Sequence, residues 1–204
     1  LFYSKAVNKL FTAESFIRYM LRFQSALARA QAEHGLIPEA AAKTIHTCCQ
    51  LENIQMETLI EHIALGGNVN IPLVKQLTQA VASKDADASK YVHLGATSQD
   101  VIDTATMLQL RDALAAIADD LDLLITQLAG LAMAHRNTLM IGRSFLQHAR
   151  PITFGFKVAR WLDPLLRSRK QLADLSQENF VLQLGGAVGT LSSMETKGIL
   201  VAKS

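Results

Sequence analysis

Five residues in one short stretch could do chemistry together: His93, Thr97, Ser98, Gln99 and Asp100. A histidine can carry a proton near neutral pH, and hydroxyl and amide groups can hold an anion. Thr97 and Asp100 also have the spacing of a capping box, which satisfies free amides at the start of a helix. Free amides, two hydroxyls and the positive end of a helix dipole together predict a carboxylate-binding site. The alternative is that the stretch only begins a helix.

The elements that must position this stretch are expected to be helices. Apolar residues recur at alternating steps of four and three over long distances, and no segment shows the alternation of a strand. The fold is therefore predicted to be all-α. An amino-terminal helix is expected to start after Thr12 and to end at Gly35, and shorter helices are expected at residues 39–50, 55–65 and 71–83.

The longest apolar stripe follows the chemical stretch and repeats every seven residues. Its members are Leu110, Leu114, Ile117, Leu121, Leu124, Leu128 and Leu131. A helix from about residue 98 to 136 would be ~58 Å long at ~1.5 Å per residue, and only a long bundle can bury such a helix. The predicted organisation is therefore an amino-terminal helical domain, residues 1–93, followed by part of a long-helix bundle, residues 94–204.

A second long helix is predicted from Phe154 to Leu182, antiparallel to the first. Trp161 is in phase with its apolar stripe and is expected in the core. The connection at residues 137–151 is expected to be irregular, and the glycines at 185–189 are expected to break the second helix.

Composition narrows the class of protein. The 204 residues are 50% hydrophobic and 19% charged, which favours a large subunit interface. A net charge of +2 gives no sign of nucleic-acid binding, and no apolar run is long enough to span a bilayer. The sequence shows no secretory leader, and the adjacent Cys48 and Cys49 suit a reducing cytoplasm. No Glu-x-x-His pattern occurs, so no metal is expected.

Residues 91–105, which contain the chemical stretch, resemble the first signature region of the fumarase/aspartase superfamily. Residues 142–155 are similar to the second signature region, and residues 183–190 also resemble the family. The resemblance implies a homotetramer with a core of long helices and with active sites assembled from three subunits. It further implies that a group is added or removed beside a carboxylate of a small di- or tricarboxylate substrate, without a metal or cofactor.

The resemblance also assigns substrate-binding roles to individual residues. Thr97, Ser98 and Gln99 would hold substrate carboxylates, and Gln147 would face the same pocket. Asn68 lies where adenylosuccinate lyases have a histidine, so it is expected to touch substrate without acid–base work.

Three residues are catalytic candidates, namely His93, Ser98 and His148. His93 would bind substrate or help to move protons. Fumarases and adenylosuccinate lyases have a histidine where this sequence has Phe145, which cannot transfer a proton, so neither activity is expected. His148 is a candidate replacement for that acid, and the alternative is an exposed histidine in a loop.

Phe145 favours the cycloisomerase branch of the superfamily, in which a bulky aromatic residue is typical of this position. The predicted reaction is lactonisation of 3-carboxy-cis,cis-muconate to 4-carboxymuconolactone, by intramolecular carboxylate addition, in protocatechuate (β-ketoadipate) breakdown. The third family signature, a mobile loop with a catalytic serine, does not occur in these residues, so the isolated chain is expected to be truncated and inactive. The alternatives are an adenylosuccinate-type lyase that releases fumarate and a non-catalytic helical assembly module.

Overall fold

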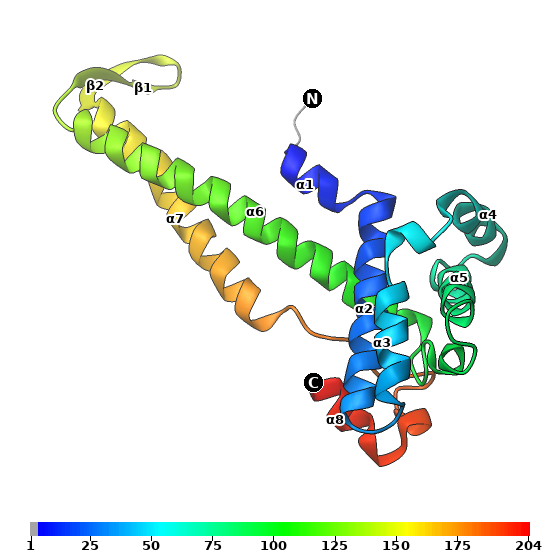
Figure 1. The fold of residues 1–204 in the computed structure, drawn as a ribbon. Helices are drawn as coiled ribbons and strands as arrows, with labels where there is room; N and C mark the ends of the chain where they lie inside the picture. Colours follow the sequence, from blue (N-terminus) through cyan, green and yellow to red (C-terminus); the bar gives the residue numbers. More distant parts are fainter. Residues whose placement is uncertain (1–3) are drawn as a thin grey trace. The chain divides into compact units, whose positions relative to one another are not determined.

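The computed structural model describes residues 4–204 and consists mainly of helices (Figure 1). The chain divides into two compact units: Leu1–Leu110 and Val181–Ser204 make up the first, and Arg111–Phe180 makes up the second. The long helix α6 (Ser98–Ala134) begins in the first unit and ends in the second. Residue 93, the predicted domain boundary, lies inside the first unit, and the predicted domain division stays a prediction.

The first unit confirms the helices predicted for the amino-terminal part of the chain, with small shifts at their ends. Besides the start of α6, its elements are α1 (Lys5–Leu10), α2 (Ala13–Glu33), α3 (Glu39–Cys48), η1 (Leu51–Asn53), α4 (Met56–Gly66), α5 (Asn70–Ala82), η2 (Ala88–Tyr91), η3 (Ser192–Lys197) and α8 (Gly198–Lys203). These helices surround one buried apolar cluster, to which every helix from α2 to α6 contributes.

Helix α2 forms the centre of this cluster. It begins at the predicted cap, because the Thr12 hydroxyl accepts a hydrogen bond from the Ser15 amide at 3.2 Å. Its apolar stripe, represented by Met20 and Leu27, is buried, and α3 lies beside it (Figure 1). The same face also carries two buried amide side chains, those of Gln24 and Gln31.

The second unit is a pair of antiparallel long helices joined by a hairpin (Figure 1). The helices are the later part of α6 and α7 (Phe154–Glu178). Near the hairpin, the Gly155 amide donates to the His135 carbonyl at 2.9 Å. Further along both helices, Arg169 of α7 pairs with Asp122 of α6 at 2.7 Å. The two helices therefore run in opposite directions, as predicted.

The irregular connection predicted at residues 137–151 is wrong, because two antiparallel strands occupy it. Strand β1 (Leu139–Ser144) pairs with β2 (Gln147–Thr153), and Ser144 lies opposite Gln147. The two turn residues, Phe145 and Leu146, both have positive φ, the sign that a two-residue type I′ hairpin requires. The usual sequence of such a turn is Asn-Gly. The hairpin was not predicted because Phe-Leu stands at the turn instead.

The core position predicted for Trp161 is also wrong in the described chain. Its side chain is 47% exposed, and the Lys157 ammonium lies 5.4 Å from the centre of its ring. The lysine stem and the indole thus cover each other at the surface of α7.

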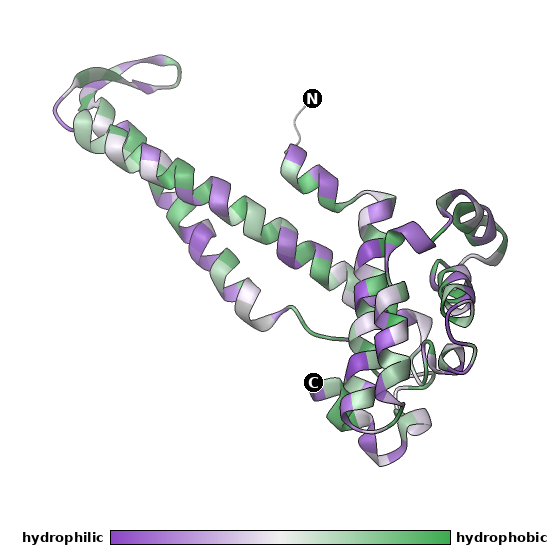
Figure 2. Cartoon of the chain, viewed as in Figure 1, coloured by the Kyte–Doolittle hydropathy of each residue, from purple (hydrophilic) through white to green (hydrophobic). Residues whose placement is uncertain are grey.

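Hydrophobic and hydrophilic residues alternate along α6 and α7 (Figure 2). In the part of the chain that the structure describes, none of the helices combines the length and the apolar character that a membrane crossing requires.

Candidate functional site

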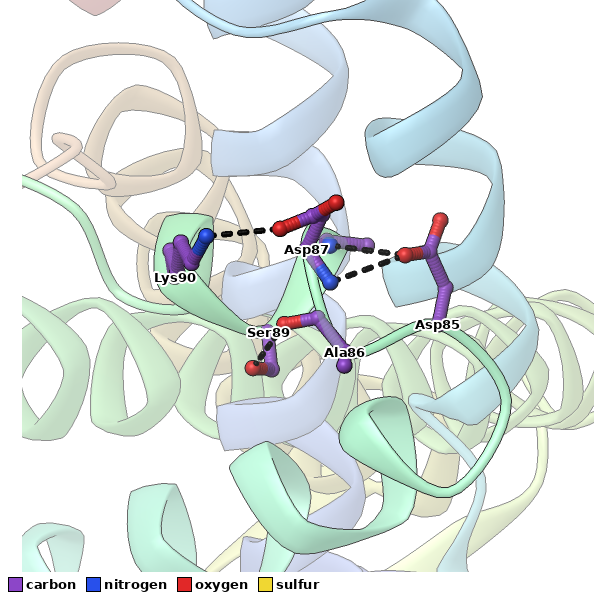
Figure 3. Close-up of polar contacts among 6 residues, drawn as sticks. Asp85, Ala86, Asp87, Ser89 and Lys90 are labelled. Atoms are coloured by element: carbon purple, nitrogen blue, oxygen red, sulfur yellow. Dashed lines mark hydrogen bonds and ion pairs between the residues drawn. The ribbon is translucent and has the colours of Figure 1, made fainter.

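The turn that precedes the signature stretch is stabilised by its own side chains (Figure 3). The Asp85 carboxylate accepts hydrogen bonds from the amides of Asp87 and of the residue after it, each at 3.0 Å. The Ser89 hydroxyl donates to the Ala86 carbonyl at 2.7 Å, and Lys90 pairs with Asp87 at 2.6 Å. That exposed pair lowers the pKa of the Asp87 carboxyl, but it contributes little stability because water screens it. The turn therefore fixes where η2 begins, just before the signature stretch.

Half of the predicted capping box is present at the start of α6. The Thr97 amide donates to the Asp100 carboxylate at 3.0 Å, which is the bond that the acidic residue of such a box makes. Gln99 is exposed and donates instead to Asp103, one helical turn further on, at 2.5 Å. The helix start is thus built by Asp100, while Gln99 lies at the surface.

Asp100 does more than cap the helix, because it is fully buried and also binds a distant segment. Its carboxylate accepts hydrogen bonds from the amides of Gly185 at 2.9 Å and of Gly186 at 3.0 Å. One turn later, the Thr104 hydroxyl donates to the Gln183 carbonyl and accepts from the Gln183 amide, both at 3.1 Å. Residues 183–186 are therefore attached to the first two turns of α6.

Two glycines allow these segments to approach one another closely. A Cβ atom on Gly186 would lie 2.9 Å from the Gly95 carbonyl oxygen, and one on Gly95 would lie 2.8 Å from the Met194 side chain. Both glycines also have positive φ, which side chains rarely tolerate. The prediction that the glycines at 185–189 break the second long helix is wrong, because α7 ends earlier, at Glu178. Gly186 instead forms part of the wall around the signature stretch.

His93 lies between two amide side chains from other helices. Its Nδ1 is 3.0 Å from Gln24 Nε2 on α2, and its Nε2 is 3.4 Å from Asn70 Nδ2 on α5. The backbone of His93 has a φ of 59°, a left-handed value that is uncommon outside glycine and often accompanies function. Burial lowers the pKa of the His93 imidazole, and the nearby Asp100 opposes this shift, so the ring is neutral at neutral pH.

Asn70 connects His93 to Ser98. Its side chain is only 1% exposed, and its Nδ2 is 3.4 Å from the Ser98 hydroxyl as well as from the imidazole. Asn68 holds the backbone of Asn70, because the Asn68 Oδ1 accepts a hydrogen bond from the Asn70 backbone amide at 2.9 Å. The structure thus brings His93, Ser98 and Asn68 into one cluster around Asn70, while Thr97 bonds to Asp100 at the start of α6.

Two members of this cluster, Asn70 and Gln24, were missed by the sequence prediction. Gln24 could have been found, because it falls in phase with Met20 and Leu27 and is a polar residue in a buried stripe. Gln31, in the same phase, donates to the Leu94 carbonyl at 2.7 Å and supports the backbone next to His93. Asn70 had no such signal, since it lies at the very start of its helix.

Gln147 and His148 lie on β2 in the second unit, and both side chains are exposed. Phe145 is 96% exposed at the hairpin turn. The cluster in the first unit is built without these residues, so the roles predicted for Gln147 and His148 stay predictions. Among the residues that the structure describes, no three histidine, cysteine or acidic side chains form a group that could hold a metal ion.

The cluster offers neutral hydrogen-bond donors together with a neutral base. The helix start and the Ser98 hydroxyl can hold an anionic oxygen without a full positive charge. A neutral imidazole can accept a proton, and its surrounding amides fix the orientation of the ring. This chemistry suits a small carboxylate whose neighbouring carbon gains or loses a proton.

Comparisons with known proteins agree with this assignment. A sequence profile of the family described as Lyase matches residues 3–203. The chain is 48% identical over 200 residues to a 3-carboxy-cis,cis-muconate cycloisomerase from Bradyrhizobium diazoefficiens, covering 98% of this chain and 44% of that protein. A nitrosuccinate lyase from Streptomyces davaonensis is 41% identical over 178 residues, covering 87% of this chain and 37% of that protein.

Solved structures show the same relationship. The β-carboxy-cis,cis-muconate cycloisomerase from Acinetobacter calcoaceticus sp. ADP1 matches with a TM-score of 0.96 and 40% identity, covering 100% of this chain and 48% of that one. The chain therefore spans under half the length of the relatives that it matches. The matched profile, the fold and the signature stretch together show that the chain belongs to the fumarase/aspartase superfamily of lyases.

Proposed function

We propose that the protein to which this chain belongs is a cycloisomerase that lactonises 3-carboxy-cis,cis-muconate to 4-carboxymuconolactone. The observation that carries the proposal is the 48% identity, over nearly the whole chain, to a cycloisomerase of that name. Phe145 supports it, because a phenylalanine cannot supply the proton that a fumarase-type site takes from a histidine.

The proposed reaction closes a ring within one substrate molecule. A carboxylate oxygen forms a bond to one carbon of a double bond, and the electron pair of that double bond moves to the carbon beside another carboxylate. That carbon then takes up a proton. Negative charge develops on the carboxylate next to it, so neutral donors aimed at this group stabilise the transition state.

Residues of the signature stretch, Asn68 and two residues of β2 supply these functions in the proposed site. Ser98, Thr97 and Gln99 hold substrate carboxylates, with Asn68 and Gln147 as further contacts. The neutral His93 moves protons or binds substrate, and His148 is the proposed additional acid. Because Gln147 and His148 belong to a separate unit, the proposed active site needs more than the amino-terminal unit.

We also propose a homotetramer that shares its active sites between subunits. Support comes from the α6 stripe, where Ile117, Leu124 and Leu131 remain exposed in the described chain although they repeat every seven residues. The isolated chain is then inactive and aggregates or associates through this stripe.

The two free cysteines, Cys48 and Cys49, support a cytoplasmic location. Burial raises the pKa of the Cys49 thiol to about 12, which makes this thiol unreactive.

The test is an assay of the full-length protein with 3-carboxy-cis,cis-muconate, followed by loss of the diene absorbance. The Ser98→Ala variant should assemble normally and lose about 100-fold or more in kcat/KM, since it lacks one transition-state donor. An intact tetramer with no turnover would overturn the proposal. Wild-type turnover in Ser98→Ala would remove Ser98 from the site and leave the cycloisomerase proposal in place.

An elimination is the second candidate, because the chain is also similar to a nitrosuccinate lyase. In that case the full-length protein, given an adenylosuccinate-type succinyl substrate, should release fumarate, which is followed by its ultraviolet absorbance. Fumarate release without lactonisation would favour a lyase. A stable tetramer inactive on both substrates would favour a helical assembly module.

A further inference from the structure

Asn70 has an unusual environment for an asparagine at the start of a helix. It is almost completely buried, and its Nδ2 is 3.4 Å from both His93 Nε2 and Ser98 Oγ. Its Oδ1 is buried without a hydrogen-bond partner among the residues that the structure describes. A buried amide with one end unpaired is costly, so the other end must make interactions that matter.

The orientation of this amide determines which nitrogen of His93 carries the proton. With Nδ2 toward the ring, each of its two hydrogens has an acceptor, one at His93 Nε2 and the other at Ser98 Oγ. The Nε2 atom is then unprotonated and accepts the Asn70 hydrogen with its lone pair, and the ring proton is on Nδ1. Gln24 places its Nε2 3.0 Å and its Oε1 3.4 Å from Nδ1. The Nδ1–H tautomer therefore requires the Gln24 amide to be turned over, so that its oxygen becomes the nearer atom and accepts the proton.

The opposite orientation of Asn70 is less favourable. Oδ1 would then accept from His93 Nε2 and from the Ser98 hydroxyl, but both hydrogens of the Asn70 amide would point into the position that now has no partner. Unpaired N–H groups are rarer in protein interiors than carbonyl oxygens with free lone pairs. The first orientation therefore satisfies more of the buried polar atoms.

We propose that Asn70 is a positioning residue that holds His93 in the Nδ1–H tautomer and turns the Ser98 hydroxyl proton toward the substrate. Because Asn70 donates to Ser98 Oγ, the Ser98 hydroxyl is left with its own proton to give. It then presents a donor, and the ligand that it recognises is an acceptor such as a carboxylate oxygen. The identity of that ligand rests on the proposed function. The tautomer of His93 does not depend on it.

The surroundings of His93 match a neutral ring in a fixed tautomer. The side chains that contact it, Gln24 from α2 and Asn70 from α5, are uncharged, and the charged group that acts on the ring is Asp100 at the start of α6. The 3.4 Å distances are longer than most hydrogen bonds, which is common in active sites before substrate binds. Substrate that accepts the Ser98 proton would shorten them.

Neutron diffraction from crystals of the perdeuterated full-length protein tests the tautomer directly. The expected result is deuterium on His93 Nδ1, none on Nε2, and the Asn70 nitrogen facing both the ring and Ser98. Deuterium on Nε2 alone, or the Asn70 oxygen facing the ring, would overturn the proposal. This measurement does not depend on activity.

The variant Asn70→Asp tests the consequence for substrate. Aspartate has the same shape but only accepts hydrogen bonds, so it should place a proton on His93 Nε2 and draw the Ser98 proton away from substrate. We expect KM for the carboxylate substrate to rise about 10- to 100-fold, with a smaller change in kcat. The apolar Asn70→Leu frees Ser98, so its rise in KM should be smaller than that of Asn70→Asp.

Asn53 offers a matched control, because its Nδ2 donates to the Cys48 carbonyl at 3.0 Å in the same unit but away from His93. Asn53→Leu should leave KM and the His93 tautomer unchanged. An unchanged KM in Asn70→Asp would overturn the link between Asn70 and substrate. If the wild-type protein turns over no muconate while neutron diffraction shows Nδ1–D, the proposed function fails and the positioning role of Asn70 stands.

Discussion

Helix α2 in the first unit and the later part of α6 in the second carry the same kind of apolar stripe, but their stripes are covered differently. Leu27 of α2 is 5% exposed, whereas Leu124 of α6 is 45% exposed in the described chain. Periodicity therefore predicted both helices, although it could not say which partner covers each stripe. The first unit has a closed core of its own, and the second presents an apolar surface that suits association.

The largest expected difference between the units concerns buried and exposed carboxylates. Asp100→Ala leaves one buried and two partly buried backbone amides without an acceptor and should lower the free energy of unfolding by about 3–6 kcal/mol. Asp163→Ala in α7 removes an exposed carboxylate that pairs with Arg167 and should cost less than about 0.5 kcal/mol. Urea denaturation of both variants measures the difference. Equal losses would show that the Asp100 contacts are not formed in solution.

The two stripes can be compared directly with one leucine from each. Leu27→Ala should cost about 2–5 kcal/mol at every protein concentration, because it opens a cavity inside the first unit. Leu124→Ala should cost less than about 1 kcal/mol in dilute protein and more in concentrated protein, where association covers the stripe. Thermal unfolding over a range of concentrations is the measurement. If the stability lost in Leu124→Ala is the same at every protein concentration, the residues that cover Leu124 belong to the same chain.

A pair of glycines sharpens the comparison at the level of the backbone. Gly95→Ala forces a side chain into a left-handed conformation against Met194, so we expect a loss of about 2 kcal/mol. Gly130 lies within α6 with open space around its α-carbon. Gly130→Ala should therefore stabilise the protein by up to about 1 kcal/mol. Urea denaturation that gives the same sign for both substitutions would contradict the tight packing of Gly95.

The smallest expected effect is a pH dependence that arises in the first unit. The pKa of His93 is lowered from its ordinary value of 6.5, so the unfolded chain binds a proton that the folded chain does not as the pH falls below 6.5. Stability should therefore decline with falling pH, and His93 should contribute at most about 1 kcal/mol between pH 6.5 and 5.5. Comparing the free energy of unfolding of wild type and of His93→Gln across this pH range isolates the contribution of His93. A His93→Gln variant with an unchanged pH profile would mean that the ring is accessible to water.

The sequence predicted helices well wherever one periodic pattern coincided with local capping signals. Thr12 and the stripe behind it located α2, and the heptads located α6 almost to its ends. The hairpin was missed because Phe145 and Leu146 adopt a turn that favours other residues, and tertiary context overrides that preference.

The candidate site was predicted in the signature stretch and at Asn68, which the family resemblance indicated. His93, Thr97 and Ser98 lie within one stretch whose types suggest anion binding, so the residues themselves indicated it. Asn70 and Gln24 come from other helices and are brought to His93 only by folding. The roles predicted for Gln147 and His148 depend on how separate units combine, and they stay predictions.

The bonds from Asp100 to Gly185 and Gly186 also bear on how the protein is made. The carboxylate lies near the middle of the chain, and its partners are 85 and 86 residues further on. A ribosome that has released the whole signature stretch has therefore not yet released the amides that hold it. The amino-terminal helices can pack early during synthesis, whereas the signature stretch takes its final shape only after the glycine segment emerges.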